Sequence, residues 1–425
     1  MAPNSATLDI QLTSPRRQRV MGVVFLLFAA AIWLLFSRNV PSGQTTTFVM
    51  TPGGFQSSFP DWKLPSLATL NILAFASAFL GAFQLVRARG FGRRTNQALA
   101  LVVGFFIFGF LVWAAAGKSM NLAGLLNGTL SKAVPLTLGA LSGVLCERAG
   151  VVNIAIEGMM LSGAMMGTIV GSLTHNLWLG LLGAVLTGML LSWVHAVLSI
   201  KYKINQIVSG TVINIFSTGI TSYISAKFLQ EYQELNNPGI FPPWEIPLLS
   251  KIPFIGHIVF ANNMFVYAMF IFLIVIHVAL FYTRWGLRLR SVGEHPKAAD
   301  TLGINVFKTR YMAVLLGGMM AGFAGGYFTL GSVGRFDEVM TAGRGFISLA
   351  AMIFGNWMPF GAFGAGLLFG FADSLASKSA ILGVQIPSQF MLMAPYVATM
   401  IVLAGVVGRG QMPAADGTPY EKESV

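Results

Sequence analysis

The 425-residue chain has one cysteine, Cys146, and only 15 acidic residues. A single cysteine excludes an internal disulfide and any cysteine-based metal site, so Cys146 is expected to be a small core residue. The five histidines are scattered along the chain without metal-ligand spacing. The sequence therefore predicts no metal site and no other cofactor.

A nucleotide-binding loop is also missing. Gly117-Lys118-Ser119 resembles the end of a phosphate-binding loop, but that pattern requires a glycine at position 112, where this chain has valine. No nucleophile paired with a base can be read from the sequence either. The chain is therefore not expected to be an enzyme or to hydrolyse ATP itself.

Hydrophobic residues make up 55% of the chain and charged residues only 10%, with 48 glycines. This composition is typical of an all-α polytopic membrane protein, because a soluble core would not need so many long uncharged runs. About twelve transmembrane helices are predicted, at residues 20–36, 66–86, 97–116, 134–146, 151–172, 177–199, 206–226, 263–283, 311–330, 345–357, 360–376 and 389–407.

The net charge of +12 follows the predicted topology. Most basic residues lie in loops that share one side of the membrane, including 87–94, 201–203 and 284–310. The positive-inside rule assigns these loops to the cytoplasm, and an even number of spans places both termini there. The orientation of the chain in the membrane thus accounts for its basic residues, and no nucleic-acid partner is expected.

The chain is organised around residues 143–167, where four polar residues stand among glycines: Glu147, Arg148, Asn153 and Glu157. An ionised side chain in a bilayer costs at least about 2.5 kcal/mol, so such residues face a cavity, a partner or the water boundary. Polar groups on a broken, glycine-rich helix are typical of a transport site. Glu147 and Arg148 can instead mark a cytoplasmic helix end, and Asn153 and Glu157 can make structural hydrogen bonds.

Two further regions carry a similar pattern. Gln206, Gly210 and Asn214 follow i, i+4 spacing, so one helix face is polar and small. A substrate path and interhelical hydrogen bonding both explain this face. Residues 343–376 pair a short apolar segment with a glycine-rich one that ends near Asp373, as 134–172 do earlier. Such pairing predicts two related halves that meet at a central site, although Asp373 also suits a helix end at the membrane surface.

The cytoplasmic loop 284–310 predicts a short surface helix with defined ends. Pro296 suits its first position, Lys297 to Leu302 make about two turns, and Gly303 suits a left-handed stop. Ala298 and Ala299 keep one face thin enough to enter a groove on another protein. On the outer side, residues 227–262 contain five prolines and predict a rigid cap, which suits a binding-protein contact, a plug or a plain connection.

Three stretches, 147–159, 293–305 and 343–355, resemble bacterial ATP-binding-cassette importer permeases of the branched-chain amino acid and simple-sugar family. The first contains Asn-Ile-x-x-Glu-Gly, which is similar to the nucleoside-uptake branch rather than to the Asp-Leu-Ser form of ribose-type permeases. The resemblance covers about residues 120–407, with the three motifs in the expected order.

The resemblance implies a permease in a bacterial plasma membrane with three kinds of partner: a cytoplasmic ATP-binding subunit, a second permease subunit and an extracytoplasmic substrate-binding lipoprotein. It also implies that Asn153 and Glu157 lie near the translocation path, to which the polar face adds Gln206 and Asn214. The ATPase-coupling residues are then Glu294, Pro296, Ala298, Ala299 and Gly303.

The chain departs from the family at its N-terminal end, where residues 1–116 add about three predicted transmembrane spans. The expected domains are thus an extension at 1–116, a permease core at 117–407 that contains the coupling loop 284–310, and a cytoplasmic tail at 408–425. A second hypothesis is an ion-coupled secondary transporter in which Glu157 or Asp373 takes up a proton or ion.

Overall fold

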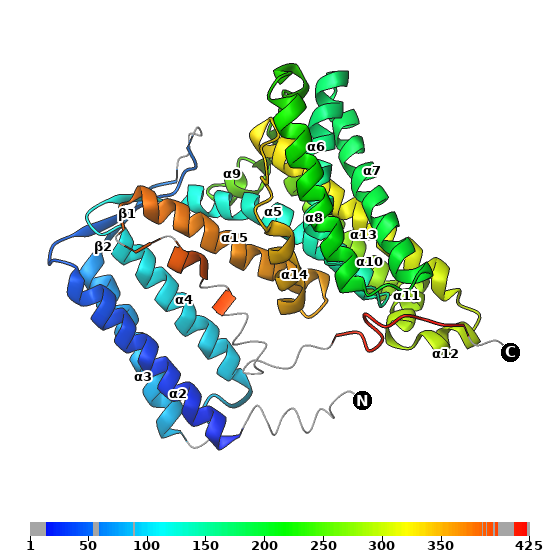
Figure 1. The fold of residues 1–425 in the computed structure, drawn as a ribbon. Helices are drawn as coiled ribbons and strands as arrows, with labels where there is room; N and C mark the ends of the chain where they lie inside the picture. The colour runs from blue at the N-terminus through cyan, green and yellow to red at the C-terminus, as the bar shows by residue number, and fades with distance from the viewer. Residues whose placement is uncertain are drawn as a thin grey trace. The chain divides into compact units, whose positions relative to one another are not determined.

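The computed structural model describes residues 14–53, 59–87, 90–384, 386–387, 389–393, 396–397 and 412–422 (Figure 1). The chain divides into two compact units, residues 1–125 with 376–388, and residues 126–375 with 389–425. Each unit has its own hydrophobic core.

The first unit contains three long helices and a small sheet. Buried Met21, Phe25, Ala98 and Val102 pack the helices together. In the sheet, the central strand β1 pairs antiparallel with β2 and parallel with β3. The elements are α2 (Pro15–Ala31), η1 (Ile32–Phe36), η2 (Ser37–Asn39), β1 (Thr45–Val49), β2 (Trp62–Pro65), α3 (Ser66–Val86), η3 (Gly92–Arg94), α4 (Thr95–Ala114) and β3 (Ser119–Asn121).

The second unit is a helical bundle with a two-stranded ribbon. Its helices are α5 (Leu122–Glu147), which begins in the first unit, α6 (Ile156–Thr174), α7 (Leu177–Ala196), α8 (Gln206–Ile224), α9 (Ile255–Val259), α10 (Met264–Tyr282), α11 (Arg284–Glu294), α12 (Pro296–Thr301), α13 (Val306–Phe328), α14 (Arg344–Phe354) and α15 (Pro359–Ile381). Shorter elements are η4 (Val197–Lys201), η5 (Ser225–Leu229), η6 (Gln233–Asn236), β4 (Trp244–Glu245), β5 (Ala261–Asn262) and η7 (Thr329–Val333).

Glycines let the central helices α6, α7 and α13 approach closely. A Cβ on Gly188 of α7 would lie 2.3 Å from the carbonyl oxygen of Gly318 in α13. A Cβ on Gly325 of α13 would lie 2.1 Å from the carbonyl oxygen of Met160 in α6. Such backbone contact replaces the hydrophobic effect as the source of helix association inside lipid. The high glycine content therefore serves packing as well as helix interruption.

Among the described residues, ten helices are long and apolar enough to cross a membrane. The predicted all-α polytopic fold is confirmed. The predicted span 345–357 corresponds to α14, whose 11 residues reach only about 16 Å and do not cross a bilayer alone. The predicted span 389–407 falls mostly outside the described residues. The ten spans are Pro15–Asn39, Ser66–Val86, Gly92–Ala114, Leu122–Glu147, Ile156–Thr174, Leu177–Lys201, Gln206–Leu229, Met264–Tyr282, Val306–Val333 and Pro359–Ile381.

One predicted boundary was wrong. Helix α5 begins at Leu122 and not near residue 134. Its polar first half includes Lys132, whose ammonium group lies 2.7 Å from the carboxylate of Asp373 in α15. This pairing allows a charged side chain within the helix, since an ion pair with good geometry offsets part of the cost of removing each charge from water.

Candidate functional site

Helix α5 ends at Glu147 and α6 begins at Ile156, so residues 148–155 interrupt the chain between two buried helices; we call them the helix break. Gly150 has a φ of +84°, which favours glycine. Its amide donates to the carbonyl of Glu147 at 2.9 Å, and the Val151 amide donates to Cys146 at 3.1 Å. These bonds end α5 and turn the chain toward α6.

Asn153 holds the helix break from within. Its side chain is fully buried, and its Oδ1 accepts from the amide of Ala155 at 3.1 Å. Its Nδ2 lies 3.5 Å from the sulfur of Cys146 and 3.8 Å from that of Met159. Asn153 thus accepts a hydrogen bond from the backbone amide one residue before α6 starts. Asparagine side chains commonly make such local hydrogen bonds to the backbone at turns.

Gln206 and Asn214, on one face of α8, complete the hydrogen bonding of this segment. The Oε1 of Gln206 accepts from the amide of Val152 at 2.6 Å. The Oδ1 of Asn214 accepts from the amide of Gly158 at 2.8 Å, and its Nδ2 donates to the carbonyl of Ile154 at 2.8 Å. The side chains of this polar face therefore form hydrogen bonds with backbone groups in residues 152–158. In a continuous helix these groups would have found their partners within the helix itself.

His195 of α7 adds a contact that the sequence did not indicate. One ring nitrogen lies 2.9 Å from the carbonyl oxygen of Val152, and the other lies 3.0 Å from the hydroxyl of Ser209. A lone histidine in an apolar segment was the only available signal, because a backbone carbonyl and a serine hydroxyl leave no recognisable pattern as its partners.

Glu157 connects α6 to the start of α14, far away in the sequence. Its carboxylate accepts from the Thr341 hydroxyl at 2.6 Å and from the amides of Gly343 and Gly345 at 2.8 Å and 2.5 Å. The amides at a helix N-terminus carry positive partial charge and favour an anion there. A Cβ on Gly345 would lie 2.5 Å from the Glu157 backbone, so the glycine permits this approach.

The other end of α14 is held by the end of α5. The indole Nε1 of Trp357 donates to the carboxylate of Glu147 at 2.5 Å, and the Nε of Arg148 donates to the carbonyl of Trp357 at 3.0 Å. Burial lowers the pKa of Arg148. The residues on both sides of the helix break therefore hold both ends of the short helix α14. The sequence did not indicate this role of Trp357, which lies in the short connection between α14 and α15.

Asp373 lies in an ion-pair cluster at partial exposure. Besides the contact with Lys132, it lies 3.6 Å from the guanidinium of Arg344 at the start of α14. The three charged side chains come from α5, α14 and α15. Asp373 is thus paired with two cations.

The coupling loop, residues 284–310, contains the predicted short helix. Helix α12 spans Pro296–Thr301, the imidazole Nδ1 of His295 accepts from the Ala298 amide at 3.2 Å, and Gly303 has a φ of +81°. Ala298 is exposed. Ala299, in contrast, is 2% exposed and packs against Val292 and Val306.

The exposed face of α12 is therefore smaller than the sequence suggested. It offers Ala298 and, just beyond the helix, Leu302, which is 81% exposed. Glu294, the last residue of α11, is exposed and accepts from the Ala414 amide at 3.2 Å. Pro296 and Gly303 fix the two ends of the helix.

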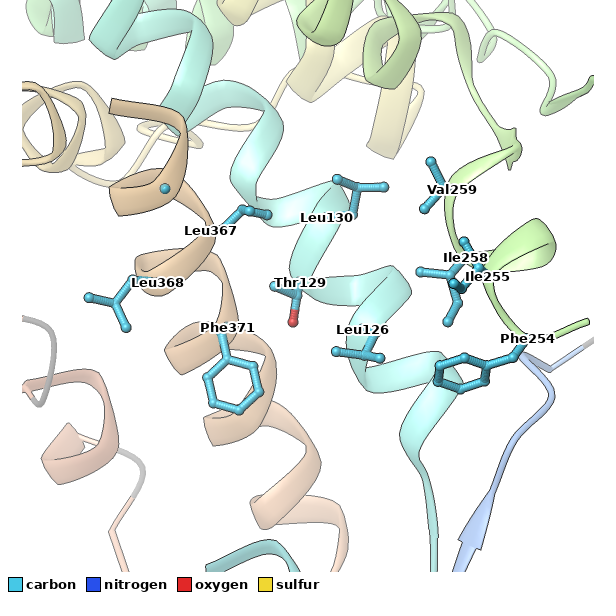
Figure 2. A pocket seen from close by; sticks show the side chains of 11 residues that line it. Leu126, Thr129, Leu130, Phe254, Ile255, Ile258, Val259, Leu367, Leu368 and Phe371 are labelled. Carbon is cyan, nitrogen blue, oxygen red and sulfur yellow. The ribbon is translucent and has the colours of Figure 1, made fainter. Parts of the chain in front are cut away.

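A cavity of about 520 Å³ lies among α5, α9 and α15, as Figure 2 shows. Thr129 is the one hydroxyl-bearing residue in its lining, beside apolar side chains such as Leu126, Phe254 and Phe371. Its lining includes none of the polar residues at the helix break.

The comparisons with known proteins agree with this architecture. A family described as the branched-chain amino acid transport system permease component matches residues 125–407. The guanosine ABC transporter permease protein NupQ of Bacillus subtilis is 42% identical over 308 residues, which cover 69% of this chain and 95% of NupQ. The nucleoside ABC transporter permease protein NupC of Lactococcus lactis subsp. cremoris is 43% identical over 297 residues, 68% of this chain and 93% of NupC.

A third relative, the putative glucose ABC transporter permease protein TsgC13 of Haloferax volcanii, is 34% identical over 328 residues, 71% of this chain and 98% of that protein. No solved structure matches the chain. The family match spans the helix break, the coupling loop and α14. The chain therefore belongs to this family, as a multi-pass, membrane-spanning permease subunit of an ATP-binding-cassette transport system.

Proposed function

We propose that this permease imports nucleosides. The observation that carries this proposal is the similarity at 42% and 43% identity to two permeases named for guanosine and nucleoside transport. The Asn-Ile-x-x-Glu-Gly motif in residues 153–158 supports the same substrate class. A related simple sugar is the alternative, because the relative named for glucose is 34% identical.

Uptake of radiolabelled guanosine by cells that express the complete transporter tests the substrate. We expect ATP-dependent uptake that an excess of unlabelled nucleoside suppresses and an excess of glucose leaves unchanged. Suppression by glucose alone would favour the sugar and contradict the nucleoside proposal.

We further propose that the helix break and α14 lie beside the translocation pathway. Asn153, Gln206 and Asn214 support this pathway by pairing the backbone of residues 152–158, and Glu157 supports it by fixing the start of α14. Their oxygen atoms already accept hydrogen bonds from the protein. These four residues therefore shape the path for substrate, and neighbouring groups complete its surface.

Helix α12 is proposed to couple the permease to the ATP-binding subunit. It is short, has fixed ends and presents the small exposed side chain of Ala298, which fits a groove on a partner. Its connections to α11 and α13 contain few residues, so a displacement of α12 reaches both helices. Such a displacement can shift a conformational equilibrium only if the partner binds the two states with different affinities.

The exposed face of α12 gives a direct test of coupling. Ala298→Glu places a large charged side chain on that face, and we expect the ATP-binding subunit to be lost on co-purification while the permease remains in the membrane. Ala298→Ser keeps the face thin and is expected to retain the subunit. Full association of the Ala298→Glu variant would refute the assignment of α12.

The structure offers little support for ion coupling by intramembrane acids. Glu157 accepts three hydrogen bonds at the start of α14, and Asp373 is paired with Lys132 and Arg344. Both carboxylates thus join helices within the protein: Glu157 binds the start of α14, and Asp373 links α15 to α5 and α14. Uptake that continues after collapse of the ion gradient but stops after ATP depletion is the expected result.

The remaining partners and the orientation are part of the same proposal. A second permease subunit would complete the pore, and an extracytoplasmic lipoprotein would deliver substrate to the outer side of a bacterial plasma membrane. We further propose that both termini and α12 lie in the cytoplasm, which the positive charge of the loops 87–94, 201–203 and 284–310 supports. Gentle extraction followed by mass spectrometry should recover the ATP-binding subunit and the lipoprotein with this chain.

A further inference from the structure

The C-terminal segment 412–422 lies beyond the residues that match the family, which end at 407. It is nevertheless held against the cytoplasmic side of its unit, where Figure 1 shows it beside α11 and α12. We call residues 412–422 the C-terminal strap. Its contacts fall on the coupling loop, on α13 and on the helix break.

Backbone hydrogen bonds fix the first half of the C-terminal strap. The amide of Ala415 donates to the carbonyl of Gly293 at 2.9 Å, and the amide of Ala414 donates to the carboxylate of Glu294 at 3.2 Å. Both acceptors belong to the last turn of α11, directly before α12. The C-terminal strap thus binds the end of α11, one residue before α12 begins.

Arg310, near the start of α13, fixes the middle of the C-terminal strap. Its guanidinium Nη1 donates to the carbonyl of Thr418 at 2.9 Å, and its charge faces the carboxyl group of Asp416. Arg310 is only 2% exposed. A guanidinium buried to this degree needs polar groups around it, and the C-terminal strap contributes the carbonyl of Thr418 and the nearby carboxyl group of Asp416.

Tyr420 supplies the apolar contact. It is 6% exposed and packs in one cluster with Val292, Ala299 and Val306, which belong to α11, α12 and α13. Its ring centroid lies 5.4 Å from that of Phe307. The tyrosine therefore packs on the inner face of α12, which carries Ala299, whereas the exposed Ala298 points away at about 100° around the helix.

The C-terminal strap also reaches the helix break. A Cβ on Gly150 would lie 3.1 Å from the carbonyl oxygen of Ala415 and 2.9 Å from the Nη2 of Arg310, so the strap packs directly on this glycine. One segment thus contacts both the inner side of α12 and the turn that joins α5 to α6.

We infer that the C-terminal strap positions α12 and transmits its movement to the helix break, with Tyr420 as its main anchor. This inference rests on the proposed coupling role of α12. It adds a positioning element for transport that the family match does not include.

Docking of the C-terminal strap can be measured separately from transport. The ammonium of Lys203 contacts the carboxylate of Glu421 at the surface, so a carbodiimide should join these two side chains by an amide bond with loss of water. Mass spectrometry of the treated complex should identify the cross-linked peptide. Lys203→Arg keeps the charge but cannot form this product, and because an exposed ion pair contributes little, its uptake should match that of the unmodified protein.

Tyr420→Asp should release the C-terminal strap, since a carboxylate cannot be buried among three aliphatic side chains. We expect the Lys203–Glu421 product and guanosine uptake each to fall about tenfold or more, at an unchanged amount of permease in the membrane. Tyr420→Phe, which retains the ring, should keep both. A chain that ends at residue 411 lacks Glu421 and the whole C-terminal strap, and its guanosine uptake should fall as in Tyr420→Asp.

Two outcomes would overturn the inference: no cross-link in the unmodified protein, or normal uptake by Tyr420→Asp when that variant has lost the cross-link. Ala298→Glu separates this result from the coupling proposal. Ala298 is not a member of the Tyr420 cluster formed by the described residues, so the cross-link should persist in that variant. Retention of the ATP-binding subunit by Ala298→Glu would refute coupling through α12 without affecting the evidence for docking.

Discussion

The Glu157 carboxylate shows how one side chain can hold an interrupted membrane helix. It receives the Thr341 hydroxyl and two backbone amides at the start of α14. In Glu157→Gln, the amide group would turn an N–H toward a backbone donor and leave a buried group unpaired. Such a loss costs about 1–3 kcal/mol, so we expect a lower melting temperature for the extracted protein and reduced uptake.

Thr341→Val is the matched control for Glu157→Gln. It removes one donor and leaves the two amides bound to the carboxylate. A melting temperature between those of the unmodified protein and Glu157→Gln is expected. Equal melting temperatures and equal uptake in all three proteins would contradict the structural role of Glu157.

Asp416 predicts a pH dependence of strap docking. Burial raises its pKa from the ordinary 3.8 to about 6, although the Arg310 guanidinium acts in the opposite direction; the Glu147 carboxyl also faces it. The Asp416 carboxyl group then binds its proton more tightly when the C-terminal strap is docked than when it is released. Docking is therefore most favourable at low pH, weakens as pH rises from about 4 to about 6, and is constant above that range.

The yield of the Lys203–Glu421 cross-link measures this dependence, with the permease equilibrated at pH 5 or pH 7.5 and all samples treated under one rapid reaction condition. We expect a higher yield after equilibration at pH 5. Asp416→Asn removes the titrating group and should make the yields equal. A yield that rises with pH in the unmodified protein would contradict the direction derived from the Asp416 pKa.

At the scale of elements, the glycine contacts predict where larger side chains are not tolerated. Gly188→Leu would force its side chain into the Gly318 carbonyl and separate α7 from α13. A Cβ on Gly219 in α8 would meet no described atom within 4 Å, so Gly219→Leu is the control. We expect Gly188→Leu to prevent accumulation of folded permease in the membrane and Gly219→Leu to accumulate normally; similar amounts of both would argue against close packing at this crossing.

An element could be predicted where neighbouring residues in the sequence determine it, and could not where contacts with distant residues determine it. Pro296 and Gly303 bracket α12, and the structure confirms the helix and the left-handed glycine, because both are set by neighbouring residues. The inward position of Ala299 could not be predicted, since it depends on packing against Val292, Val306 and Tyr420. The early start of α5 was missed for the same reason: Lys132 is paired with a residue 241 positions away.

Prediction of the candidate site was limited in the same way, because the sequence does not reveal which distant groups its side chains contact. Polar residues at the helix break and on α8 were found from composition and i, i+4 spacing, and the structure brings them together. Their partners were hidden, because backbone amides such as those of Val152 and Gly158 leave no trace in the sequence. Assignment of Asn153, Glu157, Gln206 and Asn214 to the pathway stays a prediction.

For the whole molecule, the residues before 125 are the part that the family match does not cover. The family match begins at residue 125, and the two compact units divide after Leu125. NupQ is covered to 95% of its length by only 69% of this chain. Part of this chain is thus enough to match nearly all of a relative named as a permease, and the assignment of residues 1–116 as a separate extension stays a prediction.

We therefore expect a chain that begins at residue 117 to bind the ATP-binding subunit and transport guanosine, because the helix break, α12 and α14 all belong to the second unit. Removal of three spans also removes the basic loop at 87–94, so the remaining loops 201–203 and 284–310 must orient the core. Cysteine labelling of an introduced Thr301→Cys from the cytoplasmic side checks that orientation. Correct orientation with normal membrane levels but no uptake would show that the first unit takes part in transport itself.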